Sequence, residues 1–158
     1  MRDHSGVSVD FRATDVERPP ARDLLAAMTA EMDALYETAP GGSMPTATPA
    51  DFRAPGGTFL VGFDGERPVC AGGLKALGDG AAEIKRMYVV PSDRGRGLAR
   101  ALLAALEAAA RDLGHRVVRL DTGARQPNAW ALYLSAGYTA VDDYNANPHA
   151  AHWGEKVL

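Results

Sequence analysis

The segment 83–114, EIKRMYVVPSDRGRGLARALLAALEAAARDLG, decides how this chain folds. Its first eight residues are rich in β-branched and aromatic side chains, which predicts a strand. Pro91 ends that strand because proline has no N–H to donate to a sheet. From Leu98 onward, leucine and alanine recur every three or four residues, which predicts a long amphipathic helix closed by Gly114. The segment is therefore a strand, a glycine-rich loop and a helix.

The loop between this strand and this helix has the composition of an anion-binding site. Gly95 and Gly97 let the backbone approach a ligand closely, and Arg94 and Arg96 add charge that suits a phosphate group. The first amides of a helix have no intrahelical acceptor, and the helix dipole is positive at that end. The alternative is a tight turn with two solvated arginines. We expect the loop to bind a pyrophosphate.

Three phosphate-binding patterns compete for this loop. The P-loop needs Lys followed by Ser or Thr after its last glycine, where this chain has Leu98 and Ala99. The dinucleotide fingerprint needs Gly or Ala where this chain has Arg100. The third pattern, Arg/Gln-x-x-Gly-x-Gly/Ala, is matched in full from Arg94 to Ala99. With this motif the chain resembles the GNAT superfamily of acetyl-CoA-dependent N-acyltransferases.

A second segment is also similar to that superfamily. Asn128 is followed by Leu132-Tyr133 and by Gly137-Tyr138. The resemblance implies that Tyr133 directs its hydroxyl at the cofactor sulfur as general acid, and that Asn128 contacts the cofactor. The alternatives are a half-buried Tyr133 packed on the long helix, and Asn128 as a helix N-cap.

The resemblance also assigns the cofactor contacts. It implies that backbone amides of the loop hold the pyrophosphate, and that the pantetheine arm pairs with the preceding strand. The loop residues are Arg94, Gly95, Arg96, Gly97, Leu98 and Ala99, and the strand residues are Met87, Tyr88 and Val89.

The general base and the acceptor-binding residues are less defined by the motifs. Glu83 is a candidate base acting through water, and the alternative is an exposed Glu83 paired with Lys85 or Arg86. The rival candidates for the base are Asp143, Tyr144, His149 and His152. Arg86 and Tyr144 are the candidate acceptor-binding residues, since a guanidinium can hold a carboxylate bidentately.

Composition limits the class of protein. A chain of 158 residues with 46% hydrophobic and 23% charged residues is typical of one globular domain, and we expect a single domain over residues 1–158. The net charge of −3 gives no basic field for nucleic acid. The polar first residues, the lack of a long apolar run and a single cysteine, Cys70, favour a cytoplasmic location, with Cys70 in the core.

The remaining periodicities complete the predicted fold. Pro40–Pro55 is expected to be mostly irregular: it is either a flexible connector or, as the GNAT resemblance implies, one wall of the acceptor site. We expect α/β architecture: a GNAT fold with a central mixed twisted sheet flanked by helices on both faces. Further strands are predicted at Val7–Arg12, Thr58–Phe63, Val69–Leu77, Val117–Leu120, Tyr138–Val141 and His152–Leu158, and further helices at Leu24–Leu35 and Asn128–Ala136.

The sequence therefore predicts an N-acetyltransferase that moves an acetyl group from acetyl-CoA to a primary amine by direct attack. Its alternative is a non-catalytic acyl-CoA-binding or regulatory module on the same fold. Acetyl-CoA is the expected cosubstrate, and no metal is required. The expected partner is a small-molecule amine, with no nucleic acid and no membrane, and a homodimer is compatible with the resemblance.

Overall fold

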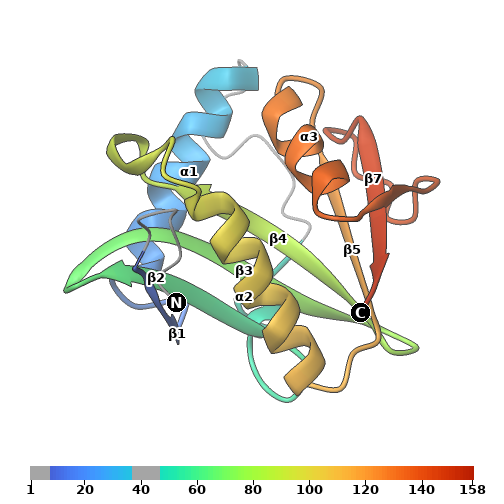
Figure 1. Ribbon diagram of the computed structural model, residues 1–158, viewed down its shortest axis with the longest axis horizontal. Coiled ribbons are helices and arrows are strands. Elements are labelled where there is room, and N and C mark those ends of the chain that lie inside the picture. The colour runs from blue at the N-terminus through green and yellow to red at the C-terminus, as the bar shows by residue number, and fades with distance from the viewer. Residues whose placement is uncertain (1–7, 37–46) are drawn as a thin grey trace.

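The structure is a computed structural model that describes residues 8–36 and 47–158. Figure 1 shows a central twisted sheet with helices on both of its faces. The described helices are α1 (Ala21–Tyr36), α2 (Leu98–Asp112) and α3 (Pro127–Ser135), with short 3-10 helices η1 (Pro49–Phe52) and η2 (Pro91–Asp93). The strands are β1 (Asp10–Ala13), β2 (Thr58–Asp64), β3 (Arg67–Gly78), β4 (Ala81–Val89), β5 (Val117–Thr122), β6 (Thr139–Ala140) and β7 (His152–Val157).

The seven strands form one mixed sheet in the order β1-β2-β3-β4-β5-β7-β6. β1 to β4 pair antiparallel in chain order, as their tight turns dictate. β4 and β5 are parallel, because α2 carries the chain back across the sheet between them. β7 then pairs antiparallel with both β5 and β6. The expected α/β fold with a mixed sheet and helices on both faces is confirmed.

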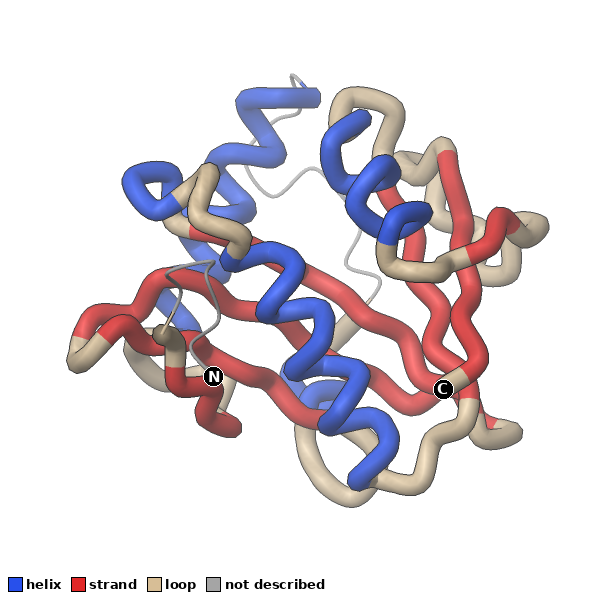
Figure 2. The backbone as a smooth tube through the Cα atoms, in the orientation of Figure 1, coloured by secondary structure: helices blue, strands red, loops and turns tan. Residues whose placement is uncertain are grey.

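Two apolar clusters hold the helices to the sheet. The backbone tube in Figure 2 shows α2 on one face of the sheet and α1 on the other. The periodic leucines of α2, among them Leu98, Leu102 and Leu106, are at most 2% exposed and pack on one face with Tyr133 of α3. Ala21 and Leu24 of α1 pack on the other face. Cys70 lies in the first cluster and is fully buried, so its prediction as a core residue is confirmed.

The boundaries differ from the sequence prediction mainly in the first third. β1 begins at Asp10, whereas Val7 lies outside the described residues. Within the segment expected to be irregular, residues 49–52 form η1, because Asp51 accepts a hydrogen bond of 2.7 Å from the amide of Thr48 and caps the turn. Residues 40–46 of that segment lie outside the described part. None of the described helices has the length and apolarity needed to cross a membrane.

β4 and β5 separate after a short stretch of pairing. The two strands pair over three residues, Ala81–Glu83 with Val117–Arg119, and then diverge (Figure 1). On its other edge β4 carries a bulge, because Gly72 of β3 faces both Arg86 and Met87. Arg86 is one of the two bulged residues, and its φ of +59° is left-handed. This conformation costs a residue with a side chain about 1–2 kcal/mol.

Candidate active site

The glycine-rich loop meets the start of α2 and borders a cavity of about 310 Å³. Gly95 and Gly97 have φ values of +82° and +78°, and a Cβ added to either would meet no atom within 4 Å. Within the described chain, the amides of residues 95–99 donate to no backbone carbonyl. Unpaired amides at a helix N-terminus beside open space suit a pyrophosphate.

Tyr133 lies in the wall of the same cavity. It is 7% exposed, its ring packs edge-on against Tyr138, and its hydroxyl lies 3.7 Å from the Sδ of Met87. A thioether is a weak acceptor, so this hydroxyl can be redirected to a better one. Burial, followed by the charge of Asp121, raises the pKa of Tyr133 to about 12, so the hydroxyl is protonated at neutral pH.

A second cavity, of about 850 Å³, shares part of its wall with the first. It lies between α1, the diverging ends of β4 and β5, and the loop before α3. Charged side chains in its wall include Lys85, Arg86, Asp121 and Arg125. The residues common to both cavities are Met87, Tyr88, Val89, Arg94, Asn128, Ala129 and Tyr133.

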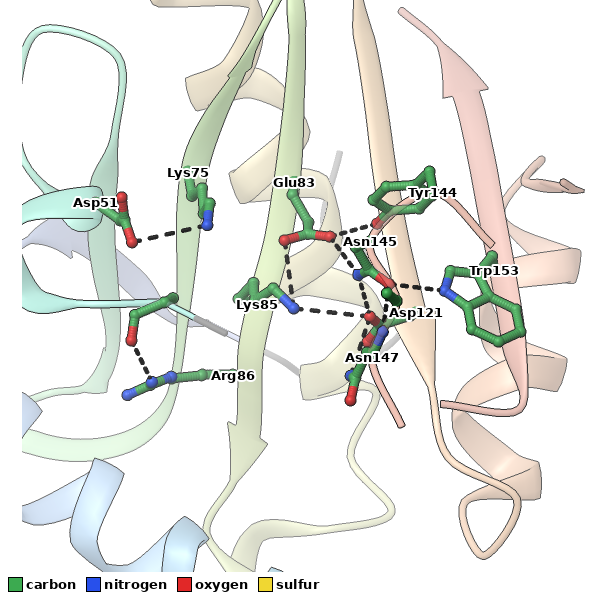
Figure 3. Close-up of polar contacts among 12 residues, drawn as sticks. Asp51, Lys75, Glu83, Lys85, Arg86, Asp121, Tyr144, Asn145, Asn147 and Trp153 are labelled. Carbon is green, nitrogen blue, oxygen red and sulfur yellow. Dashed lines mark hydrogen bonds and ion pairs between the residues drawn. The ribbon is translucent and has the colours of Figure 1, made fainter. Parts of the chain in front are cut away.

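Beside this second cavity, buried and half-buried polar side chains join β4, β5 and the loop between β6 and β7 (Figure 3). Glu83 is 2% exposed and accepts hydrogen bonds from the hydroxyl of Tyr144 (2.5 Å) and from the side-chain amide of Asn145 (3.0 Å). Its other oxygen lies 3.3 Å from the Nζ of Lys85. These contacts hold the Glu83 carboxylate away from the cavity wall, of which it is not part.

Asp121 is the second carboxylate of this group, and unlike Glu83 it lines the cavity. Its Oδ2 accepts hydrogen bonds from Asn145 (2.6 Å) and Asn147 (3.2 Å), and it lies 3.7 Å from the Nζ of Lys85. Among the described residues, its Oδ1 accepts no hydrogen bond. One oxygen is thus fixed by the protein, and the other is available to a ligand.

Comparison with known proteins identifies the family. The model of the acetyltransferase (GNAT) family matches residues 24–138, which include the loop, Tyr133 and most of both cavity walls. The chain belongs to the GNAT acetyltransferase family.

Among curated GNAT relatives, the uncharacterized N-acetyltransferase YjgM of Escherichia coli (strain K12) is 33% identical over 95 residues, covering 58% of this chain and 56% of YjgM. The uncharacterized N-acetyltransferase YedL of the same organism is 26% identical over 145 residues, 89% of each chain. The IAA acetyltransferase of Azospirillum brasilense is 41% identical over 59 residues, 37% of this chain and 39% of that protein. The chain therefore matches about half or less of two of these relatives.

Solved GNAT structures share the whole fold. A Klebsiella pneumoniae protein assigned as an acyl-CoA N-acyltransferase is 29% identical, with a TM-score of 0.73 over 95% of this chain and 97% of that one. A GNAT acetyltransferase from Elizabethkingia anophelis with acetyl-CoA bound is 13% identical, with a TM-score of 0.67 over 95% and 98% of the two chains. At that identity the likeness concerns the fold alone.

Most of the residues predicted for the cofactor gather around the first cavity of this GNAT fold. Arg96 does not line it, and Asn128 is the second residue of α3, whose N-cap is Gln126, so the N-cap interpretation of Asn128 is wrong. The predicted residues in the wall are Met87, Tyr88, Val89, Arg94, Gly95, Gly97, Leu98, Ala99 and Asn128.

The two loop arginines are already paired with carboxylates. Arg94 binds Glu31 of α1 at 2.8 Å, and Arg96 binds Asp93 at 2.7 Å and Asp64 at 3.0 Å. Arg96 lies outside the wall of the first cavity, whereas Arg94 lines that cavity while paired with Glu31. Their side chains fasten the loop to α1 and to the β2–β3 hairpin.

Asp93 is the centre of the ion cluster under the loop. It is 3% exposed and accepts hydrogen bonds from Arg67 at 2.6 and 2.9 Å and from Arg96 at 2.7 Å. The hydrogen bond from Arg67 is the largest cause that lowers the pKa of Asp93 to about 2.

We therefore expect Asp93 to stabilise the fold in a pH-dependent way. Its folded pKa lies below the unfolded value of about 3.9, so its contribution is complete above that value and is lost as the pH falls toward 2. In urea unfolding between pH 2 and 7, Asp93→Asn should be less stable than wild type at pH 6 and nearly equal to it at pH 2. The control is Asp142→Asn, which alters an exposed carboxylate. A constant difference across the whole range would contradict this role.

The remaining predicted residues lie in varied positions. Glu83 is buried and paired with Lys85, so the interpretation of an exposed Glu83 is wrong. Tyr144 is outside both cavity walls; burial, then the charge of Glu83, raises the pKa of its hydroxyl. Arg86 and His149 line the second cavity, as a substrate contact and a rival base would.

Two rival bases have structural partners instead. Asp143 accepts the backbone amides of Asn145 and Ala146 at 3.0 and 2.7 Å, which shapes the turn. His152 stacks on Trp130 with a ring separation of 4.8 Å. Across residues 8–36 and 47–158, no group of three or more His, Cys, Asp or Glu residues is arranged to hold a metal ion.

Sequence reasoning missed Asp121. The signal available was its position at the end of an apolar strand that follows a parallel crossover, since ligands of α/β sheets bind at the carboxyl ends of strands.

Proposed function

We propose that residues 1–158 form one N-acetyltransferase domain that transfers an acetyl group from acetyl-CoA to a primary amine by direct attack in a ternary complex. The observation that supports this most is the wall shared by the two cavities, with Tyr133 in it. A donor held in the smaller cavity and an amine held in the larger one would meet there, so no covalent enzyme intermediate is needed. Bound acetyl-CoA supplies the acetyl group as a thioester.

In this proposal the residues of the chain bind and orient acetyl-CoA and donate a proton to its departing sulfur. The amides of residues 95–99 hold the pyrophosphate, and the strand from Met87 to Val89 aligns the pantetheine arm. Asn128, in the wall of both cavities, contacts the cofactor. Tyr133 donates its hydroxyl proton toward the departing sulfur.

We assign to Asp121 the role of the base that takes a proton from the acceptor's ammonium group, so that the neutral amine can attack, with Glu83 next to it as a second carboxylate. Asp121 lines the second cavity, which we call the acceptor cavity, and one of its oxygens has no hydrogen-bond partner in the described chain. Both oxygens of Glu83 have partners from the protein. Lys85 lies between the two carboxylates and can stabilise charge on either.

We therefore expect Asp121→Asn to lower the acetylation rate more than Glu83→Gln. The loss should be on the order of 10² at pH 6, where the amine arrives protonated, and should shrink toward pH 9. The measurement is a pH–rate profile on both variants, with melting temperatures as the check on folding. If Glu83→Gln alone lost the acidic limb, the base would be Glu83 acting through water.

The rival function is a non-catalytic acyl-CoA sensor on the same fold. Both functions require that CoA and acetyl-CoA raise the melting temperature more than ATP or NADP do, since a ligand of the folded state stabilises it by mass action. The two functions differ in turnover. An acetyltransferase should release the thiol of CoA from acetyl-CoA only when a primary amine is added, whereas a sensor should release none. Tight binding without release for any amine would favour the sensor, and equal stabilisation by ATP would contradict both.

A further inference from the structure

Arg86 is placed unusually for a charged residue. It lies within β4, next to Met87, yet its backbone has a φ of +59°. Its Nη2 donates to the carbonyl of Ala47 at 2.8 Å, and its guanidinium lies 5.6 Å from the ring centre of Phe52. Non-glycine residues keep such a conformation when the surrounding structure requires it, and they cluster at functional sites.

The guanidinium of Arg86 has no carboxylate within 4 Å in the described chain. The carboxylate whose charge acts on Arg86 is Asp51, which is paired with Lys75 at 3.8 Å and hydrogen-bonded to Thr48. Burial lowers the pKa of Arg86, which reflects the cost of removing its charge from water. Arg86 is half-buried, and a partly desolvated charge without a counter-ion is unfavourable, so an anion arriving there would offset that cost.

The other cations of the acceptor cavity are arranged differently. Lys85 is neutralised by Glu83 and Asp121, and Arg94 by Glu31. Arg125 donates to the carbonyl of Leu35 at 2.8 Å and is exposed. Arg86 is therefore the cation in this wall that is half-buried and also lacks an ion-pair partner among the described residues.

We propose that Arg86 binds a carboxylate carried by the acceptor, so that the substrates of this site are amino acids or other amines bearing a carboxylate. The inference rests on the proposed acetyl transfer. A guanidinium matches a planar carboxylate with two parallel hydrogen bonds. A singly charged group suits one unpaired cation, whereas a phosphate would bring excess negative charge beside Asp121 and Glu31. Its position one residue before Met87 sets the acceptor's carboxylate close to the wall that both cavities share.

The test compares matched acceptors on wild type and Arg86→Gln. The pairs differ by a carboxylate alone: γ-aminobutyrate with propylamine, and phenylalanine with 2-phenylethylamine. Glutamine keeps a donor for Ala47 and introduces no β-branch at the positive φ. For each pair, the ratio compares kcat/KM for the compound with a carboxylate to kcat/KM for the compound without one. We expect this ratio to be at least about tenfold lower in Arg86→Gln than in wild type, chiefly because KM for the carboxylate compound rises. Each amine's own pKa cancels, because the same two compounds are used on both proteins.

Two further variants and one binding measurement complete the design. Arg22→Gln removes an exposed arginine of α1 and should leave the ratio unchanged, while Arg86→Lys should retain part of it. Calorimetry of 3-phenylpropionate with CoA-saturated protein reports the carboxylate site without turnover. Carboxylate binding that is lost in Arg86→Gln, with no amine acetylated, would support the site and reject the acetyltransferase. Turnover with an unchanged ratio, or equal carboxylate binding by both proteins, would overturn the inference.

Discussion

Tyr133→Phe should reduce kcat by a factor on the order of 10²–10⁴ and leave the dissociation constant of acetyl-CoA nearly unchanged. Phenylalanine keeps the ring that packs against Tyr138 and removes the hydroxyl beside Met87. That hydroxyl has no strong partner in the described structure, so its loss costs little in the resting protein. The hydroxyl stabilises the transition state, in which negative charge develops on the cofactor sulfur. An interaction made only in the transition state raises kcat and leaves the binding of acetyl-CoA unchanged.

The control for this variant is Tyr138→Phe. The hydroxyl of Tyr138 donates to the buried Glu107 at 2.8 Å, so its removal should lower the melting temperature without a comparable loss of kcat. Since the pKa of Tyr133 is about 12, the wild-type profile should show no alkaline limb from this residue below pH 11. If kcat and acetyl-CoA binding fell together in Tyr133→Phe, the residue would be a cofactor contact and not an acid.

Gly97→Glu should weaken acetyl-CoA binding by a factor on the order of 10³, about 4 kcal/mol. The open space beside Gly97 admits a side chain, so the fold can accept the substitution. The carboxylate would occupy the space in front of the unpaired amides and repel a pyrophosphate. Calorimetric titration of acetyl-CoA measures the loss directly.

Gly78→Glu is the matched control, because it shares the backbone strain but not the location. Gly78 also has a positive φ, +94°, and open space around it, and it is the last residue of β3, outside both cavity walls. Both variants should lose a similar 1–2 kcal/mol from the left-handed conformation. Acetyl-CoA affinity should fall in Gly97→Glu alone; equal affinities in the two variants would place the pyrophosphate elsewhere.

Local sequence patterns were sufficient for the elements that depend on local physics. The start of α2 at Leu98 follows from the end of the glycine loop, and its leucine period places the buried face. The β2–β3 hairpin follows from its Asp64-Gly65 turn, and the strand before the loop was misjudged by two residues at its start. Tyr133 and Asn128 were found because their segment has a recognisable pattern.

The positions of the charged side chains could not be predicted, because they depend on partners far away in the sequence. Arg96 does not line the first cavity, because its side chain reaches Asp64 on the β2–β3 hairpin. Glu83 is buried because Tyr144 and Asn145, some sixty residues later, cover it and satisfy its oxygens. The bulge that sets Arg86 exists only when β3 and β4 pair. Periodicity reports which face is apolar, and it carries no information about such long-range pairs.

The three-residue pairing of β4 with β5 also has a consequence for cooperativity. Beyond Glu83, β4 has no strand partner on that edge within the described sheet, so its backbone should open locally at a lower free energy than the rest. A ligand that contacts both β4 and α3 would connect the two halves of the sheet there. Amide hydrogen exchange along β4 should then slow when acetyl-CoA binds, and the region that opens most easily without ligand would become part of the cooperative unit.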